Sequence, residues 1–220
     1  MANQNAKPEW RMGGITVPEV EEYLYDMLPA RDEVLTEMEA DAAQNDYAIV
    51  GPVVARVLYQ LAVISGAKKV FELGSAIGYS TVWWARGVGE GGKVVYTDGD
   101  PKRAEKARRY FDRAGVSSRI AVRVGDALEI LSEEKQPYDI IFNDVDKTDY
   151  PRVFRLALPR LKSGGLFIAD NVLWKGKLCK PNPDEKTRAI LEFNRLICES
   201  KDLFTSILPI RDGVAVCVKR

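Results

Sequence analysis

The sequence predicts an α/β fold built on a doubly wound, mostly parallel sheet of seven strands. From residue 67 onwards, short apolar runs typical of strands alternate with segments of helical periodicity. Polar residues and glycines gather where these runs end, as expected where strands of an open sheet meet a ligand crevice. The last two runs are joined by a short connection that contains glycine, which predicts an antiparallel hairpin strand at one side of the sheet.

The chain before the sheet is predicted to be helical. Residues 1–14 are expected to form a flexible arm, residues 15–66 the N-terminal helices and residues 67–220 a Rossmann-like core, all in one domain of 1–220. Apolar spacing predicts one helix over Pro18–Ala43, and a second that opens at Pro52 and stops at Gly66.

The remaining elements follow in order along the chain. Strands are predicted at Lys69–Leu73, Lys93–Thr97, Arg119–Val124, Tyr138–Asn143, Gly165–Ala169, Leu203–Pro209 and Val214–Val218. Helices are predicted at Tyr79–Arg86, Pro101–Ala114, Ala127–Glu133, Asp149–Leu161 and Asp184–Glu199.

Composition excludes several classes of protein. Of the 220 residues 46% are hydrophobic, and 32 cations balance 32 anions, which argues against broad electrostatic binding of nucleic acid. No apolar run is long enough to span a membrane, and the polar start lacks a signal-peptide core. The three scattered cysteines predict reduced thiols and a cytoplasmic protein. With no histidine, acid–base and metal chemistry fall to Asp, Glu, Asn, Lys or Tyr.

A glycine-containing loop follows the first predicted strand, in the run Glu72-Leu73-Gly74-Ser75-Ala76-Ile77-Gly78-Tyr79-Ser80. Gly74 allows a sharp turn and close approach of a ligand, and Gly78 and Ser80 fall at a helix start that favours an anion. The spacing of these two glycines weakens a dinucleotide interpretation. The plainer alternative is that they only permit tight turns.

Two later strand ends strengthen the cofactor interpretation. Asp98 ends the second strand, where an acidic residue can accept both hydroxyls of a ribose. Asp126 and Ala127 follow the third strand and could line an adenine, with Asp126 as the partner of its exocyclic amine.

A second polar cluster follows the fourth and fifth predicted strands. Asp144 ends one, and Asp170 and Asn171 end the other. If the strands are neighbours, their ends lie roughly 5 Å apart, and two carboxylates that close need a cation or a proton between them. Two carboxylates and an amide suit Mg²⁺ or Ca²⁺. The alternative is that these residues cap a helix and start a loop.

Four motifs, in order, give the chain a resemblance to a known family. They are Phe71-Glu72-Leu73-Gly74 with Gly78-Tyr79-Ser80, Asp144-Val145-Asp146-Lys147, the run from Asp170 to Gly176, and the run from Leu208 to Val214. The chain resembles the catechol and caffeoyl-CoA O-methyltransferases, the cation-dependent branch of class I methyltransferases, from about Tyr23 to Arg220.

The resemblance implies a Rossmann-like methyltransferase that uses S-adenosylmethionine and a divalent cation to methylate a catechol-like aromatic hydroxyl. It implies that Asp144, Asp170 and Asn171 bind the metal and that Lys147 is the general base, and it also suggests a homodimer. The residues implied to hold S-adenosylmethionine are Val50, Glu72, Gly74, Ser75, Gly78, Tyr79, Ser80, Asp98, Asp126, Ala127 and Asp144.

Several features leave alternatives open. Trp174 is expected either to wall the aromatic pocket or simply to pack. The basic residues between Lys102 and Arg113 predict a solvated helix face, or else an RNA contact, since some relatives in the superfamily methylate hydroxyuridine in tRNA. A nicotinamide-dependent dehydrogenase is the rival enzyme class, and it leaves Asp144, Asp170 and Asn171 unexplained. A non-catalytic cofactor-binding protein is the other rival, and the intact Lys147 and metal ligands argue against it.

Overall fold

The computed structural model describes residues 13–220, so the predicted arm over 1–14 lies almost wholly outside the described residues. The helices are α1 (Pro18–Asp26), α2 (Glu33–Asn45), α3 (Gly51–Ile64), α4 (Tyr79–Val88), α5 (Pro101–Arg113), α6 (Ala127–Glu133), α7 (Tyr150–Ala157) and α8 (Glu185–Glu199). The strands are β1 (Lys69–Leu73), β2 (Lys93–Asp98), β3 (Ile120–Val124), β4 (Tyr138–Asn143), β5 (Leu161–Ala169), β6 (Leu203–Leu208) and β7 (Val214–Lys219). Short 3-10 turns occur at η2 (Ser117–Arg119), η3 (Lys147–Asp149), η4 (Leu158–Arg160) and η5 (Trp174–Cys179).

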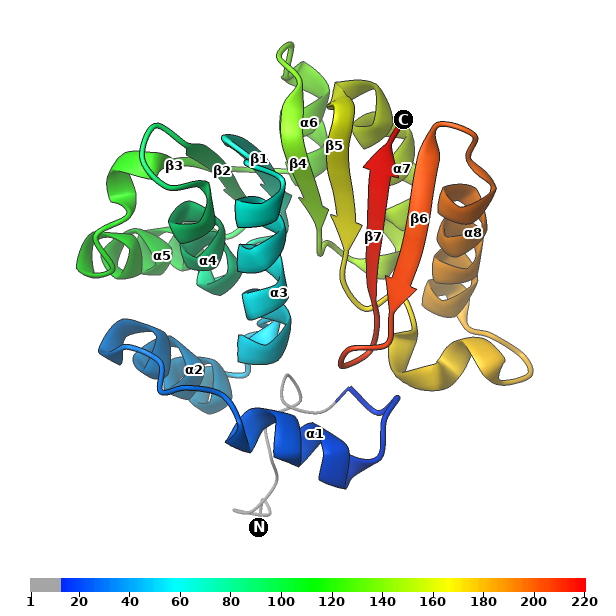
Figure 1. The fold of residues 1–220 in the computed structure, drawn as a ribbon, viewed down its shortest axis with the longest axis horizontal. Coiled ribbons are helices and arrows are strands. Elements are labelled where there is room, and N and C mark those ends of the chain that lie inside the picture. The colour runs from blue at the N-terminus through cyan, green and yellow to red at the C-terminus, as the bar shows by residue number, and fades with distance from the viewer. Residues whose placement is uncertain (1–12) are drawn as a thin grey trace.

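The seven strands form one sheet in the order β3-β2-β1-β4-β5-β7-β6 (Figure 1). Strands β1 to β5 pair in parallel, and β7 runs antiparallel to both β5 and β6. The predicted parallel sheet with an antiparallel C-terminal hairpin strand is therefore confirmed. The order reverses between β1 and β4, so the ligand crevice of such a sheet is expected at their carboxyl ends.

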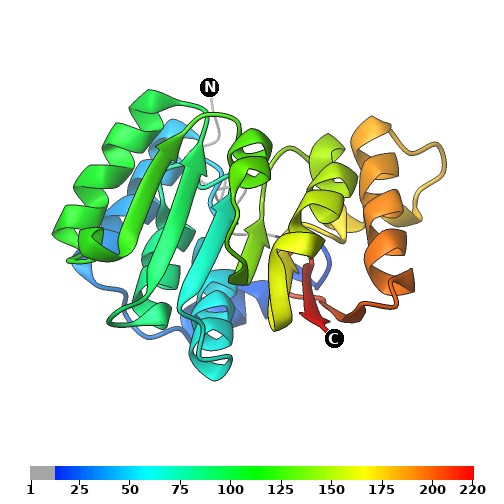
Figure 2. The ribbon, with the colours of Figure 1, turned by 90° about the horizontal axis from the view of Figure 1, so that it is seen from above.

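Helices cover both faces of the sheet (Figures 1 and 2). Alternate side chains of one strand point to opposite faces, so Ile140 and Phe142 pack with α3, α4 and α5, whereas Ile141 packs with α6, α7 and α8. Trp83 and Trp84 are buried in the first of these two layers. Both faces of the central strands are thus apolar, and the polar site residues lie at strand ends.

The single helix predicted over Pro18–Ala43 is wrong, because the chain forms two helices there. Pro29 lacks an N–H and disfavours helical geometry in Leu28, which ends the first helix. Asp32 then starts α2 by accepting the Leu35 N–H at 3.2 Å.

The helix predicted over Asp149–Leu161 is too long at its end. Helix α7 stops at Ala157, a 3-10 turn that contains Pro159 follows, and Leu161 is already the first residue of β5. Strand β5 therefore begins four residues before the predicted Gly165.

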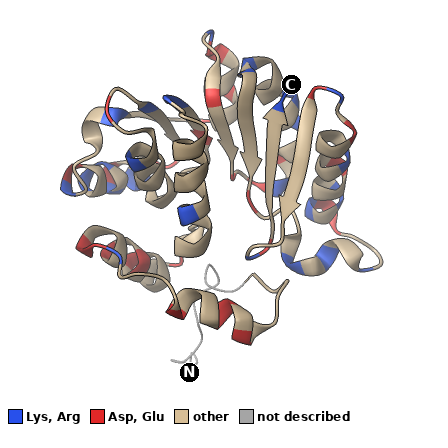
Figure 3. Cartoon of the chain, in the orientation of Figure 1, with Lys and Arg blue, Asp and Glu red and all other residues tan. Residues whose placement is uncertain are grey.

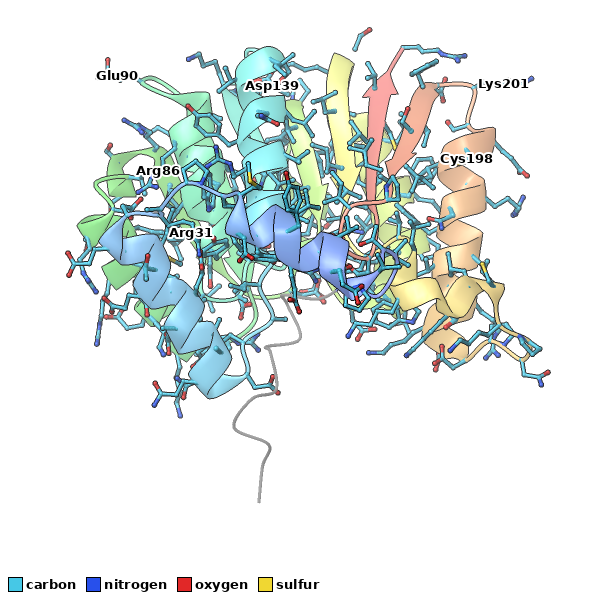
Figure 4. The ribbon with its side chains drawn as sticks, turned by 60° about the horizontal axis from the view of Figure 1, so that its bottom comes forward. Arg31, Arg86, Glu90, Asp139, Cys198 and Lys201 are labelled. Carbon is cyan, nitrogen blue, oxygen red and sulfur yellow. The ribbon has the colours of Figure 1, made fainter. Side chains whose placement is uncertain are left out.

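Helices α1 and α2 lie across the rim formed by the strand carboxyl ends (Figure 1). Glu90, Asp139 and Lys201 mark the opposite rim, where strands begin (Figure 4). None of the helices within residues 13–220 has the length and apolar character needed to cross a membrane.

Candidate active site

A cavity of about 960 Å³ opens at the strand carboxyl ends, at the predicted crevice. It unites residues from distant parts of the chain. Of the residues predicted from sequence, those that line it are Gly74, Asp98, Asp126, Ala127, Asp144, Lys147, Asn171 and Trp174.

Gly74 makes the close approach between the loop after β1 and the end of β4. Its φ is +81°, and a Cβ at this position would lie 2.5 Å from the Asp144 carbonyl oxygen. A side chain would therefore meet backbone as well as strained φ. The glycine lets the cofactor loop and the Asp144 segment share one wall of the cavity.

We expect Gly74→Ala to lower the free energy of unfolding by about 2 kcal/mol or more, because it adds a backbone clash to the cost of positive φ. Gly91→Ala is the matched control, since Gly91 also has positive φ but a Cβ there would meet nothing within 4 Å. Urea denaturation measures both. Equal losses would show that the contact with Asp144 does not matter.

Glu72 lies beneath the cofactor loop and does not line the cavity. Its carboxylate is fully buried and accepts the hydroxyls of Ser75, at 2.8 Å, and of Thr81. Burial raises the pKa of Glu72 to about 7, although hydroxyl hydrogen bonds oppose the shift. Its second oxygen has no partner. The structure thus gives Glu72 a role in organising the loop, and its direct contact with the cofactor stays a prediction.

Other predicted cofactor residues also lie outside the cavity lining. Val50 is buried in the apolar core, while Ile49 beside it lines the cavity. The Tyr79 hydroxyl donates to Glu39 at 2.7 Å, which ties α4 to α2. The turn that starts α4 contains or adjoins Ser75, Gly78 and Ser80, and none of these three lines the cavity.

Asp98 and Asp126 present carboxylates to the cavity, each with hydrogen-bonding capacity remaining. Asp98 accepts the Ala76 and Asp100 N–H groups, one on each oxygen. Burial raises the pKa of Asp98, and Arg103, 3.5 Å away, opposes this shift. Asp126 does cap α6, but both cap bonds use Oδ1. Its Oδ2 remains for an adenine amine, so capping and cofactor binding are compatible.

Asp144, Asp170 and Asn171 come together as predicted, because β4 and β5 pair with Asn143 opposite Ala169. The Asp170 carboxylate is fully buried and neither oxygen has a hydrogen-bond partner. Burial raises the pKa of Asp170 to about 7, the Arg211 guanidinium opposes the rise, and Asp144 adds to it. An unpartnered buried carboxylate beside a second one fits a cation.

Asn171 and Asp144 each keep an oxygen for such a cation. The Asn171 amide nitrogen donates to Asp212 at 2.8 Å, which leaves the amide oxygen as the available ligand atom. Lys147 contacts Asp144 through Oδ1 only. Within residues 13–220 no three His, Cys, Asp or Glu side chains are arranged to hold a metal, so the amide of Asn171 is needed to complete the set.

Lys147 is held at the edge of this cluster by three acceptors. Its Nζ donates to Asp144 Oδ1 at 2.9 Å, to the Val145 carbonyl at 3.3 Å and to the Tyr150 hydroxyl at 2.8 Å. The Tyr150 hydroxyl donates in turn to the Asp170 carbonyl at 2.9 Å. The predicted base and the predicted metal ligands therefore form one network.

The hairpin between β6 and β7 adds two residues that the sequence analysis interpreted only as a turn. Asp212 is buried and orients Asn171, and the Arg211 guanidinium lies beside it, with 3.4 Å between Nε and Oδ1. The N–H groups of Val172 and Leu173 donate to the Gly213 and Asp212 carbonyls. The one signal in the sequence was that Arg211-Asp212 stood in a motif of the resemblance.

The basic face of α5 is largely exposed, as predicted, and two of its cations also pair with α2. Lys106 pairs with Asp41 at 2.8 Å and Arg113 with Glu37 at 2.6 Å, both on α2. These contacts hold α2 over the cavity rim, and they use two of the charges that an RNA contact would need.

Comparisons with known proteins agree with this fold and identify its family. Residues 27–220 match the model of a family described as O-methyltransferase. A catechol O-methyltransferase of Niastella koreensis is 34% identical over 216 residues, covering 90% of this chain and 96% of that protein. A catechol O-methyltransferase of Mycobacterium tuberculosis is 35% identical, covering 76% of this chain and 77% of that protein.

Solved structures show the same similarity. An O-methyltransferase from Bacillus cereus, solved with S-adenosylhomocysteine, has a TM-score of 0.83 and 34% identity, covering 92% of this chain and 97% of that one. The Streptomyces achromogenes O-methyltransferase TomG, solved with S-adenosylmethionine, has a TM-score of 0.83 and 26% identity over 91% of this chain and 96% of that one. The chain belongs to the class I S-adenosylmethionine-dependent O-methyltransferase family.

Proposed function

We propose that this enzyme methylates one hydroxyl of a catechol-like aromatic and that a divalent cation is required. The observation that carries the proposal is the buried Asp170 carboxylate, which lacks any partner and lies behind the cavity wall, next to Asp144 and Asn171, which line it. The similarity to two catechol O-methyltransferases supports the substrate class. The family assignment decides against a nicotinamide-dependent dehydrogenase, and the ion pairs of α5 disfavour tRNA as the acceptor.

Asp144, Asp170 and Asn171 would hold the cation. When bound, a divalent ion would supply Lewis-acid chemistry that makes the oxyanion of the acceptor hydroxyl easier to form. Asp98 and Asp126 would hold the ribose and adenine of the methyl donor at the other half of the cavity. This division would bring donor and acceptor together at the wall that Gly74 shares with Asp144, so that their orientation would contribute to the rate.

Lys147 would receive the hydroxyl proton on Nζ. To do so it must be a neutral amine, which has two N–H groups and one lone pair. If Asp144 gives up its contact, the Val145 carbonyl and the Tyr150 hydroxyl remain as two acceptors for those two N–H groups. The lone pair would then be free for the substrate proton.

Metal removal and replacement test the proposal. We expect protein stripped with EDTA to bind S-adenosylhomocysteine but not to methylate catechol. Mg²⁺ and Ca²⁺ are the first ions to add back in order to restore turnover. Because Asp170 must lose its proton to bind a cation, metal affinity measured by calorimetry should rise about tenfold per pH unit below pH 7 and level off above it. Full turnover in the stripped protein would refute the proposal.

A further inference from the structure

The half of the cavity that faces the methyl acceptor is bordered by lysines. Lys175 and Lys177 on η5 and Lys186 at the start of α8 line it, next to Trp174. Figure 3 shows this segment coloured for Lys and Arg where the chain passes from β5 to α8. The other half presents the carboxylates of Asp98 and Asp126. Asp144 and Asp146 lie among the lysines, paired with Lys147 and Lys186, so the lysine side of the cavity carries charges of both signs.

Most of the cations that line the cavity already have a carboxylate partner. Lys147 pairs with Asp144, Lys186 with Asp146 and Arg103 with Asp98. Lys177 differs from these, because no carboxylate of residues 13–220 forms an ion pair with it within 4.0 Å. Its charge does act on Asp184, whose pKa is lowered mainly by hydrogen bonds from Thr187 and further by the charge of Lys177. The direct contact of Lys177 is with the face of Trp174, 5.2 Å from the ring centroid.

Trp174 connects Lys177 to the reacting centre. The Nζ of Lys147 lies 5.9 Å from the centroid of the same ring, so the two ammonium groups are at most about 11 Å apart. An aromatic acceptor placed beside Trp174, with its hydroxyls toward Lys147, can therefore direct a substituent on the opposite ring edge toward Lys177. The indole Nε1 is itself buried and has no partner.

The backbone holds this arrangement in an unusual conformation. Trp174, Lys175 and Gly176 have φ values of +46°, +52° and +71° in succession. Two of the three are not glycine, and strained backbone of this kind concentrates at ligand sites. The Trp174 N–H donates to the Asn171 carbonyl at 3.1 Å, which connects the segment directly to the proposed metal ligand.

We propose that the acceptor is a catechol carrying a carboxylate and that Lys177 binds this carboxylate. The inference rests on the proposed function and narrows its substrate class. An ammonium group without an ion pair, at the edge of the acceptor ring opposite the hydroxyls, favours a carboxylate there. A neutral catechol would make no charged contact with it. Lys177 is exposed, so solvent screening limits its effect to about fivefold in affinity.

The test compares 3,4-dihydroxybenzoate with its neutral amide in the wild type, Lys177→Met and Lys177→Glu. Lys180→Met is the matched control, because Lys180 ends the same segment but does not line the cavity. Two quantities are measured for each compound: kcat/KM for methyl transfer, and the dissociation constant by calorimetry with Mg²⁺ and S-adenosylhomocysteine present. Using the benzoate-to-amide ratio within each protein cancels the intrinsic difference between the compounds.

We expect Lys177→Met to lower the benzoate-to-amide ratio about fivefold through KM, Lys177→Glu to lower it further, and Lys180→Met to leave it unchanged. Lys180→Met should retain methylation of both compounds. An unchanged ratio in Lys177→Met, or an equal fall in Lys180→Met, would overturn the inference. Failure of the wild type to methylate either compound would instead refute the catechol proposal, while the calorimetric ratios would still report on Lys177.

Discussion

Replacing Asp170 by Asn is expected to reduce turnover at least about a thousandfold, because a cation at this site contributes several kcal/mol to the transition state. The substitution keeps the shape of a fully buried side chain and removes only its capacity to become an anion. Affinity for S-adenosylhomocysteine should change little, since Asp98 and Asp126 occupy the other half of the cavity. Steady-state kinetics with catechol and calorimetry with the cofactor product measure the two effects.

Asp139→Asn is the control for this experiment. Asp139 lies on the neighbouring strand β4 but at its amino end, on the rim opposite the cavity (Figure 4). It accepts the Lys68 and Lys69 N–H groups, which an amide oxygen can also do. This variant should retain turnover. If Asp170→Asn also remains active, a metal held by Asp170 has no part in the reaction.

Replacing Glu72 by Gln is expected to make the stability of the metal-free protein less dependent on pH. The free energy of unfolding of the variant minus that of the wild type should be about 3 kcal/mol larger at pH 8 than near pH 4.5. Below pH 4.5 the carboxyl is protonated in both folded and unfolded chains, so it adds no pH dependence. Between pH 4.5 and 7 the unfolded chain loses the proton while the folded chain keeps it, which favours unfolding. Above pH 7 the cost is constant.

Urea denaturation of both proteins at several pH values measures this difference. Other titrating groups are common to the two proteins and cancel in the comparison. A difference in unfolding free energy that does not change with pH would show that Glu72 ionises as readily in the folded chain as in the unfolded one. Cofactor affinity of the variant would then show separately whether the loop after β1 needs a carboxylate.

The sheet could be predicted because each of its strands carries a local signal. Ile140 to Phe142 and Leu166 to Ile168 are apolar without interruption, as required where both faces are covered. The break within Pro18–Ala43 was missed because apolar residues recur on both sides of Pro29 at helical spacing. The prediction relied on apolar periodicity and gave too little weight to Pro29, which ends the first helix.

The site was predictable where function follows from strand ends and not where it depends on tertiary contact. Asp144 and Asp170 each follow a strand directly, so parallel pairing brought them together. Asp212 reaches Asn171 from 41 residues away, and no spacing rule indicates that contact. Glu72 and Tyr79 stand in the recognised loop, yet their side chains turn inward to Thr81 and Glu39. Sequence position does not reveal that direction.

The segment η5 has one more consequence. None of its six residues is buried, although it carries both Trp174 and Lys177. Its sequence is therefore less constrained by core packing than Asp170 and Lys147, which are buried. Substitutions in the part of this segment that follows the motif, Lys177 to Cys179, could change which acceptors are methylated while the proposed metal ligands stay the same.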